Sequence, residues 1–502
     1  MIERILDARV YDVARETPLD PARRLGARLG CRVLLKREDL QPVFSFKLRG
    51  AYNRMSRLAP REVERGVIAA SAGNHSQGVA LAASRLGLRA RIVMPVTTPR
   101  IKVDAVTDLG ADVVIHGDTY DDAEVRARAE AEAEGLPLIH PYDDLDVIAG
   151  QGTIGVEVLR QHPDPIEAIF VPVGGGGLIA GIASYVKFLR PETQVIGVEP
   201  EDSACLHAAL EQGRRVVLDT VGIFADGVAV RQVGREPWRL VQGRIDGVVR
   251  VNTDAICGAI LDIFEDTRTM AEPSGALAVA GLKQHVEDHG GSGATRVAIV
   301  SGANINFHRL RHISERAELG QHREAILGVT IPERPGSFRE FCSSLGDLSI
   351  TEFNYRYADP EAAHVFVGIE LRDGAPEKAE AFARLRKGGY AVVDMSDNET
   401  AKLHARHLVG GRAPGVTDER VFRFEFPERP GALGRFLDEM AADWNITLFH
   451  YRNHGAARGR VLVGLQVPRA DDRRFAGFLS GLDLPCVEET ENPAYRLFLA
   501  GD

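Results

Sequence analysis

Short apolar runs alternate with amphipathic, helix-like segments along the first part of the chain. An apolar run that is bounded by turn residues and followed by a helical pattern is typical of βαβ units, which build parallel sheets covered by helices. The strand-like runs are residues 31–36, 66–70, 90–95, 112–115, 169–173, 194–199 and 297–300. The helix-like segments include residues 102–109 and 120–134, and residues 150–155, within 143–159, are expected to open a third helix. The pattern therefore predicts an α/β fold with a parallel sheet and helices on both faces.

Three of these apolar runs end in loops of small residues. In open α/β sheets, ligands bind beyond the carboxyl ends of the strands, so these loops are candidate segments of a site. The loops are Ser71-Ala72-Gly73-Asn74-His75 after the run at 66–70, Gly174-Gly175-Gly176-Gly177-Leu178 after 169–173, and Ser301-Gly302-Ala303-Asn304 after 297–300.

Lys47 is the candidate reactive group. It lies between apolar neighbours in Ser45-Phe46-Lys47-Leu48-Arg49-Gly50, at a junction between a strand and a helix. Burial disfavours the ammonium form, lowers the lysine pKa and leaves more free amine to attack a carbonyl. A lysine that forms a Schiff base needs this property. The alternative is an ordinary lysine with an apolar stem and a solvated head.

The glycine loop at 174–177 has two further interpretations. Bare backbone N–H groups at the start of a helix suit a phosphate group, whereas the alternative is a turn that only lets a helix pack closely. Residues 175–180 also satisfy the G-x-G-x-x-G/A fingerprint, and Glu199 follows at a strand end, as in a dinucleotide site. A nicotinamide-dependent oxidoreductase would leave Lys47 and the two other loops unexplained.

The last part of the chain contains an internal repeat. Each copy reads strand, Pro-Gly turn, helix, strand, strand, helix, strand, which predicts a ferredoxin-like βαββαβ module. A duplicated domain explains the repeat better than a solenoid, whose units are much shorter. A polar helical segment at 307–323 is expected to be a neck before the repeat, and residues 412–415 a linker within it. The matching segments are 331–338 with 426–433, 350–356 with 446–452, and 365–369 with 461–465.

Composition and charge narrow the class of protein. The 502 residues exceed what one core holds, so about two to four domains are expected. The net charge of −10 comes with no basic block, which argues against nucleic acid or an anionic membrane as a partner. The N-terminus lacks a signal-peptide core, and no apolar run is long enough to span a membrane. The five scattered cysteines form no CxxC pair, so we expect no metal site and no disulfide framework, and a reducing cytoplasm fits best.

Lys47, the Asn74 loop, the glycine loop and the Ser301 loop, in this order, resemble the fold-type-II enzymes that use pyridoxal phosphate. Within that group, residues 1–320 are most similar to threonine deaminase (threonine ammonia-lyase), and the repeat resembles the ACT-like regulatory domains of its biosynthetic form. The resemblance implies a catalytic domain of two three-layer α/β subdomains at 1–320. It also implies ACT-like α+β domains at 321–409 and 417–502.

The resemblance also implies roles for the site residues. Lys47 holds the cofactor as a Schiff base and, once freed by the substrate, takes the Cα proton. Ser301 faces the pyridine nitrogen, where a hydroxyl supports a pyridinium less than a carboxylate does, so that β-elimination is favoured. Glu272 matches a family motif, but no role is assigned to it. The remaining roles are the cofactor ring for Phe46, the ring hydroxyl oxygen for Asn74, the cofactor phosphate for Gly174, Gly175, Gly176, Gly177 and Leu178, and the substrate carboxylate for Ser71, Ala72, Gly73, Asn74 and His75.

The function implied by the resemblance is the deamination of L-threonine to 2-oxobutanoate and ammonia, the committed step of isoleucine biosynthesis. L-serine is an expected second substrate. L-isoleucine is expected to inhibit through a site that includes Tyr355 and Tyr451, with L-valine opposing it, in a cytoplasmic homotetramer. The alternatives are other fold-type-II reactions (serine racemisation, threonine synthesis, cysteine synthesis) and a non-catalytic amino-acid sensor. The intact Lys47, Asn74, glycine loop and Ser301 argue against the sensor.

Overall fold

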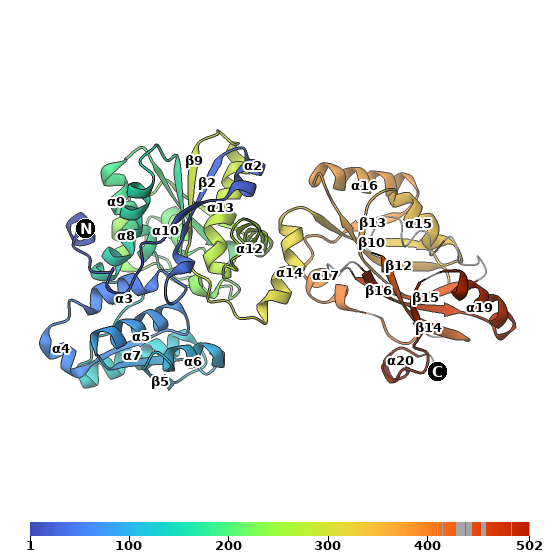
Figure 1. Cartoon of the computed structure of the whole chain (residues 1–502), viewed down its shortest axis with the longest axis horizontal. Coiled ribbons are helices and arrows are strands. Elements are labelled where there is room, and N and C mark those ends of the chain that lie inside the picture. The colour runs from blue at the N-terminus through green and yellow to red at the C-terminus, as the bar shows by residue number, and fades with distance from the viewer. Residues whose placement is uncertain are drawn as a thin grey trace. The chain divides into compact units, whose positions relative to one another are not determined.

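The computed structural model describes residues 1–408, 410–413, 415–427, 437, 444–452, 458–482 and 484–500. The chain divides into two compact units, Met1–Gly320 and Gln321–Asp502 (Figure 1). Each unit has its own sheets and its own hydrophobic core. No helix in the described part of the chain is long and apolar enough to cross a membrane.

A six-stranded sheet forms the centre of the first unit. Its order is β1-β2-β9-β6-β7-β8, and all neighbours are parallel except β1 and β2. Alternate side chains point to opposite faces of each strand, so Phe170 packs with one group of helices and Ile169 with another. The strands are β1 (Leu19–Pro21), β2 (Arg32–Arg37), β6 (Ala168–Pro172), β7 (Gln194–Pro200), β8 (Gly247–Val251) and β9 (Thr295–Val300).

Helices cover both faces of this sheet and make it a three-layer structure. One face is covered by α2 (Arg23–Leu29), α12 (Thr253–Thr267), α13 (Pro273–His289) and α14 (Arg309–Gly320). The other is covered by α8 (Leu145–Gln161), α9 (Gly177–Leu189), α10 (Cys205–Gln212) and α11 (Arg235–Val241). The short elements of this layer system are α1 (Ile2–Leu6), η1 (Glu38–Leu40), η2 (Glu201–Ser203) and η3 (Asp226–Val228).

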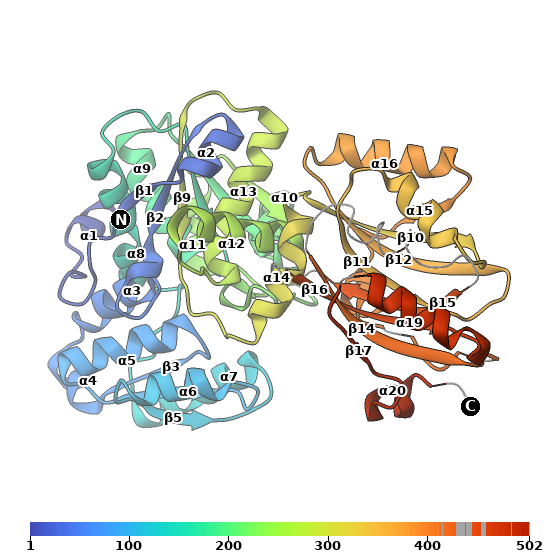
Figure 2. The same cartoon turned by 45° about the vertical axis from the view of Figure 1, so that its right-hand side comes forward.

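A second, smaller sheet of three parallel strands completes the first unit (Figure 2). Val67 and Ala69 pack toward one face of this sheet, whereas Ile68 and Ala70 pack toward the other. Both subdomains are therefore three-layer α/β structures, which confirms the predicted fold class. The strands are β3 (Val67–Ala70), β4 (Ala90–Met94) and β5 (Asp112–Ile115), and the helices are α3 (Lys47–Met55), α4 (Pro60–Arg65), α5 (Asn74–Leu86), α6 (Arg100–Thr107) and α7 (Tyr120–Glu134).

The expected helix opening at residues 150–155 is wrong, because these residues lie in the middle of α8. The helix starts earlier, where the carboxylate of Asp144 accepts the backbone N–H groups of Asp146 and Val147 as an N-cap. A Cβ atom at Gly150 would lie 2.6 Å from the carbonyl oxygen of Arg49 in α3. The glycines in this segment therefore reflect close packing between helices.

The second unit is one eight-stranded sheet of order β13-β10-β12-β11-β15-β16-β14-β17. Its two repeats join where β11 and β15 pair antiparallel. The first repeat shows the predicted βαββαβ order, whereas the match at 426–433 lies largely outside the described residues. The strands are β10 (Glu324–Pro332), β11 (Ile350–Arg356), β12 (Ala362–Glu370), β13 (Ala391–Asp394), β14 (Glu419–Pro427), β15 (Asn445–Arg452), β16 (Arg458–Gln466) and β17 (Cys486–Glu488).

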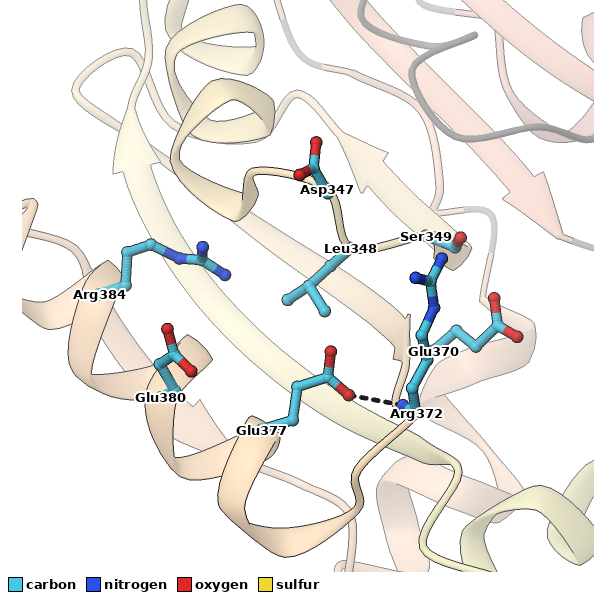
Figure 3. A pocket seen from close by; sticks show the side chains of 8 residues that line it. All are labelled: Asp347, Leu348, Ser349, Glu370, Arg372, Glu377, Glu380 and Arg384. Carbon is cyan, nitrogen blue, oxygen red and sulfur yellow. Dashed lines mark hydrogen bonds between the residues drawn. The ribbon is translucent and has the colours of Figure 1, made fainter.

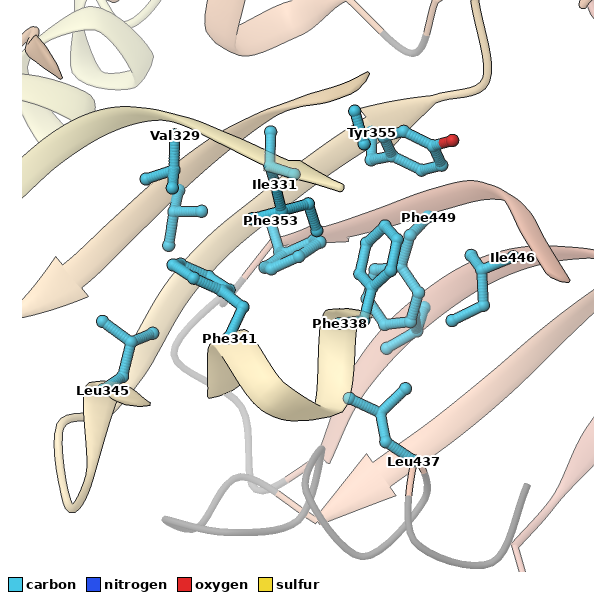
Figure 4. Close-up of a cluster of buried hydrophobic side chains, with 14 of the residues drawn as sticks. Val329, Ile331, Phe338, Phe341, Leu345, Phe353, Tyr355, Leu437, Ile446 and Phe449 are labelled. Carbon is cyan, nitrogen blue, oxygen red and sulfur yellow. The ribbon is translucent and has the colours of Figure 1, made fainter. Parts of the chain in front are cut away.

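Helices α15, α16 and α19 pack on one face of this sheet, and α20 packs on the other. Phe338 and Phe341 of α15 contact Phe353 at the centre of the sheet, and Phe449 of the second repeat packs against Phe353 (Figure 4). One aromatic cluster thus spans both repeats. The helices are α15 (Ser337–Leu345), α16 (Ala375–Lys387), α17 (Glu399–Leu403), η4 (Ala405–His407), η5 (Arg469–Asp471), α19 (Asp472–Gly481) and α20 (Pro493–Phe498).

Candidate active site

The Ser301 loop lies directly against the segment that carries Lys47. The backbone N–H of Phe46 donates to the carbonyl oxygen of Ser301 at 3.2 Å, and Ser45 forms a β-bridge with Gly302. Lys47 is the first residue of α3. The loop at the end of β9 therefore meets the start of α3, although one belongs to the large sheet and the other packs on the small one.

The amine of Lys47 is enclosed and held by one backbone contact. Its Nζ donates to the carbonyl oxygen of Pro141 at 3.0 Å, and the side chain is only partly exposed. Burial lowers the pKa of Lys47 to about 8, and the charge of Glu272 opposes part of this shift. A neutral amine is therefore accessible near neutral pH, as the apolar neighbours of Lys47 suggested.

His75 of the Asn74 loop lies close to Lys47. Its Nε2 donates to the carbonyl oxygen of Ile139 at 2.7 Å. Burial, and then the charge of Lys47, lower the pKa of His75 to about 3, so the imidazole is neutral at physiological pH. Ser71 is buried as well, whereas Ala72, Gly73 and Asn74 are partly exposed. The loop ends in the first turn of α5, whose N-cap Gly73 offers no side chain to its backbone N–H groups.

The glycine loop presents bare backbone at the start of α9. Gly176 has φ of +88°, a left-handed conformation that favours glycine, and it caps α9 with no side-chain acceptor. A Cβ atom on Gly175 would lie 2.3 Å from the ring of Tyr142, and one on Gly177 would lie 3.0 Å from the Tyr142 carbonyl oxygen. Because Pro141 binds Lys47 and Tyr142 packs on this loop, the 141–142 segment connects the amine to the glycines.

A chain of side-chain hydrogen bonds connects the Asn74 loop to the Ser301 loop. The amide of Asn304 donates to Asn74 Oδ1 at 2.7 Å, and Asn74 Nδ2 donates to Glu272 Oε1 at 2.5 Å. Glu272 is buried, and burial raises its pKa to about 7. Ser301 is buried too, and its hydroxyl donates to the carbonyl oxygen of Ser274 at 3.2 Å.

Lys47, Phe46, Ser301, Asn74 and His75 are thus brought together, and the glycine loop joins them through residues 141–142. Pro141, Tyr142 and the role of Asn304 were not predicted from the sequence. Asn304 had a detectable signal, because it ends the Ser301 loop motif. Pro141 and Tyr142 had none, since they follow an isolated β-bridge rather than a recognisable strand.

The helix that carries Lys47 rests on a buried ionic cluster. The guanidinium of Arg49 binds Glu38 through Nε at 2.8 Å and Glu157 through Nη1 at 2.6 Å. Lys36 binds the same Glu157 at 2.6 Å. All four side chains have 0% exposure. Two cations and two carboxylates therefore balance their charges beneath α3.

The residues expected to bind an effector lie where the two repeats join. Tyr355 pairs with Phe449, and Tyr451 pairs with Phe353, so all four rings share one face of the sheet. The Tyr355 ring is buried against Phe338 (Figure 4). Its hydroxyl donates to the carboxylate of Glu333, which raises the Tyr355 pKa in addition to the effect of burial.

Glu333 contacts both repeats. It accepts from Tyr355 of the first repeat and, at 2.9 Å, from the amide of Asn445 in the second. A separate polar pocket lies in the first repeat between α16 and the ends of β11 and β12, and neither Tyr355 nor Tyr451 lines it (Figure 3). Its lining residues are Asp347, Leu348, Ser349, Glu370, Arg372, Glu377, Glu380 and Arg384.

Comparison with known proteins agrees with this arrangement. Residues 10–302 match the family described as pyridoxal-phosphate dependent enzyme, and residues 315–405 and 410–499 match the C-terminal regulatory domain of threonine dehydratase. The biosynthetic L-threonine dehydratase IlvA of Burkholderia multivorans is 57% identical over 99% of both chains. That of Escherichia coli is 52% identical over 99% of this chain and 96% of its own.

A solved structure of a threonine deaminase also resembles this chain. The match to the structure of the processed form of threonine deaminase isoform 2 from Solanum lycopersicum covers 63% of this chain and 92% of that chain. Its TM-score is 0.62, and the sequences are 52% identical. The chain belongs to the biosynthetic threonine dehydratases, a family that depends on pyridoxal phosphate and carries a C-terminal regulatory domain.

Proposed function

We propose that this chain converts L-threonine to 2-oxobutanoate and ammonia with pyridoxal phosphate held by Lys47. The observation that carries the proposal is the partly buried amine of Lys47, with its pKa lowered to about 8, beside the Asn74 and Ser301 loops. Residues 1–320 would be the catalytic domain, and residues 321–409 and 417–502 the two ACT-like regulatory domains.

Two features fit this cofactor. The low pKa of Lys47 suits condensation with an aldehyde, because only the neutral amine is a nucleophile. The first turn of α9, capped only by Gly176, offers backbone N–H groups to a phosphate. Phe46, Leu178 and the glycines 174–177 would surround the cofactor. When bound, pyridoxal phosphate withdraws electrons and acidifies the Cα proton of an attached amino acid.

Lys47 and the loop residues would then act on the substrate. The freed amine of Lys47 accepts the Cα proton, and its pKa near 8 lets it exchange protons near neutral pH. The loop of Ser71, Ala72, Gly73, Asn74 and His75 would hold the substrate carboxylate, with the first turn of α5, which has no side-chain cap, offering backbone N–H groups. Loss of the β-hydroxyl as water leaves an enamine, and hydrolysis of that enamine releases 2-oxobutanoate and ammonia. L-serine would give pyruvate by the same route.

Ser301 would oppose the nitrogen of the cofactor ring. Its buried hydroxyl already donates its one hydrogen to the Ser274 carbonyl oxygen. It can therefore only accept a hydrogen bond from the ring nitrogen, unless it gives up the bond to Ser274. A neutral hydroxyl cannot stabilise a positive ring as a carboxylate would. This weaker withdrawal favours expulsion of the β-hydroxyl over longer-lived carbanion chemistry.

For regulation, we infer that L-isoleucine binds near Tyr355 and Tyr451 and that L-valine opposes it. The aromatic face where the repeats join suits an aliphatic side chain, and the nearby Glu333 carboxylate suits an ammonium group. Inhibition requires that L-isoleucine prefer one of two states of the enzyme, typically by about 1–3 kcal/mol. We also propose a homotetramer located in the cytoplasm, and light scattering of the purified protein checks its mass.

The test of the reaction is an oxo-acid assay on protein loaded with pyridoxal phosphate. Wild-type protein should form 2-oxobutanoate from L-threonine, and Lys47→Ala should lose nearly all turnover. Lys378→Ala, which changes a lysine of the regulatory unit that pairs with Asp394, is the matched control and should keep it. Absence of oxo acid with the wild-type protein, or full turnover in Lys47→Ala, would refute the proposal.

The test of regulation compares the full chain with a chain that ends after residue 320. The shortened protein should remain active and lose inhibition by L-isoleucine. In the full chain, Tyr355→Ala or Tyr451→Ala should weaken inhibition and spare turnover without the effector. Equal inhibition of the shortened and full chains would mean that L-isoleucine acts at the active site instead.

A further inference from the structure

Glu272, which has no assigned role so far, is a buried carboxylate beside the candidate active site. Its backbone N–H donates to the carbonyl oxygen of Gly302 at 3.1 Å, which ties it to the Ser301 loop. A Cβ atom at Gly302 would lie 2.5 Å from Glu272 Oε1, so the carboxylate packs tightly against that loop. The hydroxyl of Ser274 donates to the same oxygen at 3.1 Å. These contacts hold the carboxylate in one place.

The hydrogen bonds through Asn74 run in one direction. The amide nitrogen of Asn304 donates both to the carbonyl oxygen of Val43, at 2.9 Å, and to Asn74 Oδ1. A backbone carbonyl can only accept, so the orientation of the Asn304 amide is set. Asn74 Oδ1 must then accept, and Asn74 Nδ2 must donate, which it does to Glu272 Oε1.

One hydrogen of Asn74 remains for a ligand. An amide nitrogen carries two hydrogens, and in the described part of the chain Asn74 Nδ2 makes one hydrogen bond, to Glu272. Asn74 therefore presents a donor, and not an acceptor, to the site. A donor at this point selects an anionic or acceptor oxygen, such as an ionised ring hydroxyl of a hydroxypyridine.

We propose that Glu272 is a positioning residue which, by accepting from Asn74, aims the second Asn74 N–H at the ionised ring oxygen of the cofactor. The inference rests on the proposed function, because it takes pyridoxal phosphate as the occupant of the site. Glu272 acts through Asn74 and does not itself touch the cofactor oxygen. Burial and then the charge of Asp226 raise the pKa of Glu272 to about 7, and the hydrogen bonds from Asn74 and Ser274 oppose part of this shift.

A double-mutant cycle on cofactor affinity tests this role without relying on turnover. Apoenzyme variants are titrated with pyridoxal phosphate, followed by quenching of tryptophan fluorescence. Glu272→Ala should weaken binding roughly five- to tenfold, the effect of about one misdirected hydrogen bond. In an Asn74→Ala background the same change should have no further effect, since the amide it orients is gone. Additive effects of the two changes would overturn the proposal.

A conservative variant separates positioning from charge. Glu272→Gln keeps an acceptor oxygen for Asn74, so its affinity should lie within about twofold of the wild type, and the visible absorption of the bound cofactor should titrate at the wild-type pH. An affinity as low as that of Glu272→Ala would overturn the role as acceptor. Circular dichroism of each apoenzyme checks that the fold is intact.

Glu199 provides the matched control. It too is buried, with its pKa raised to about 7 by burial, but it accepts the N–H groups of Leu206 and His207 rather than an Asn74 hydrogen. Glu199→Ala and Asn74→Ala should therefore combine additively. Non-additivity of this pair as large as that of Glu272 with Asn74 would overturn the inference. Threonine turnover by wild-type protein tests the proposed function separately, so the two failures are distinguishable.

Discussion

Replacing Arg49 by methionine should destabilise the catalytic unit more than almost any other single change of a charged residue. Methionine keeps an unbranched apolar side chain but removes the guanidinium. Arg49 forms two hydrogen bonds to Glu38, both at 2.8 Å, and two to Glu157, at 2.6 and 3.0 Å. Without it, two fully buried carboxylates share Lys36 as the remaining cation of the cluster.

The expected cost follows from burial. Removing one partner of a buried ion pair typically costs about 3–5 kcal/mol, because the other charge stays buried and unpaired. That is a large share of the roughly 5–15 kcal/mol by which domains are stable. Arg91 is the matched control, since its Nη1 also binds two glutamates, Glu130 at 2.8 Å and Glu134 at 2.7 Å, but it is 33% exposed. Arg91→Met should cost less than about 1 kcal/mol.

The assay is urea unfolding followed by tryptophan fluorescence. The chain has two tryptophans, so Trp444→Phe leaves Trp238 to report on the first unit alone. Equal losses of unfolding free energy in Arg49→Met and Arg91→Met would mean that the buried cluster beneath α3 contributes no more than a surface ion pair.

The pH dependence offers a second check on Arg49→Met. Although burial would raise it, Arg49 and then Lys36 hold the pKa of Glu157 below its ordinary 4.5. The stability that this carboxylate contributes is present above that pKa and is lost as the pH falls through the folded-state value. In Arg49→Met, the unpaired carboxylates can take up protons at higher pH. The stability gap between wild type and variant should therefore narrow from pH 8 to pH 5, and a gap that widens would contradict the account.

Four further outcomes are expected. Folding lowers the pKa of Lys47 from 10.5 to about 8, so between these pH values the unfolded apoenzyme binds more protons than the folded apoenzyme. The free energy of unfolding should therefore rise with pH over this range, and Lys47→Met should lack that rise. The rate of cofactor capture should rise with pH and level off above about 8, and a rise that continues to pH 10 would argue against the lowered pKa. Ser301→Asp should slow oxo-acid formation and raise transamination, measured as pyridoxamine phosphate, and unchanged products would remove its assigned role. Tyr355→Phe, which loses the hydroxyl bond to Glu333, should weaken isoleucine inhibition less than Tyr355→Ala does, as inhibition curves would measure.

The sequence was most informative where local pattern and function coincide. Apolar runs that are followed by loops of small residues identify the ends of β3, β6 and β9. A buried parallel strand is apolar throughout, and the loop after it must be free to bind a ligand. The repeat similarly revealed two modules, and the pairing of β11 with β15 then places Tyr355 and Tyr451 on one face. The division into two sheets was implied by the family resemblance but not by the apolar pattern, since β3 has the same pattern as strands of the large sheet.

Contacts between distant parts of the chain were beyond the sequence. Arg49 lies two residues after Lys47, yet nothing local showed that Glu38 and Glu157 would enclose it. The bond from Asn74 to Glu272 joins two loops that only the packing of the two subdomains brings together. The segment at 150–155 was misread because glycines that admit a neighbouring helix look like glycines at a helix start.

The role of Lys47 is tested most simply by locating the cofactor on the chain. Purified protein loaded with pyridoxal phosphate is reduced with borohydride, digested and mapped by mass spectrometry. We expect the phosphopyridoxyl group on the peptide that contains Lys47, and we expect L-threonine added before reduction to lower this yield. Recovery of the group on another lysine, or an unmodified Lys47 in protein that turns over L-threonine, would contradict this role.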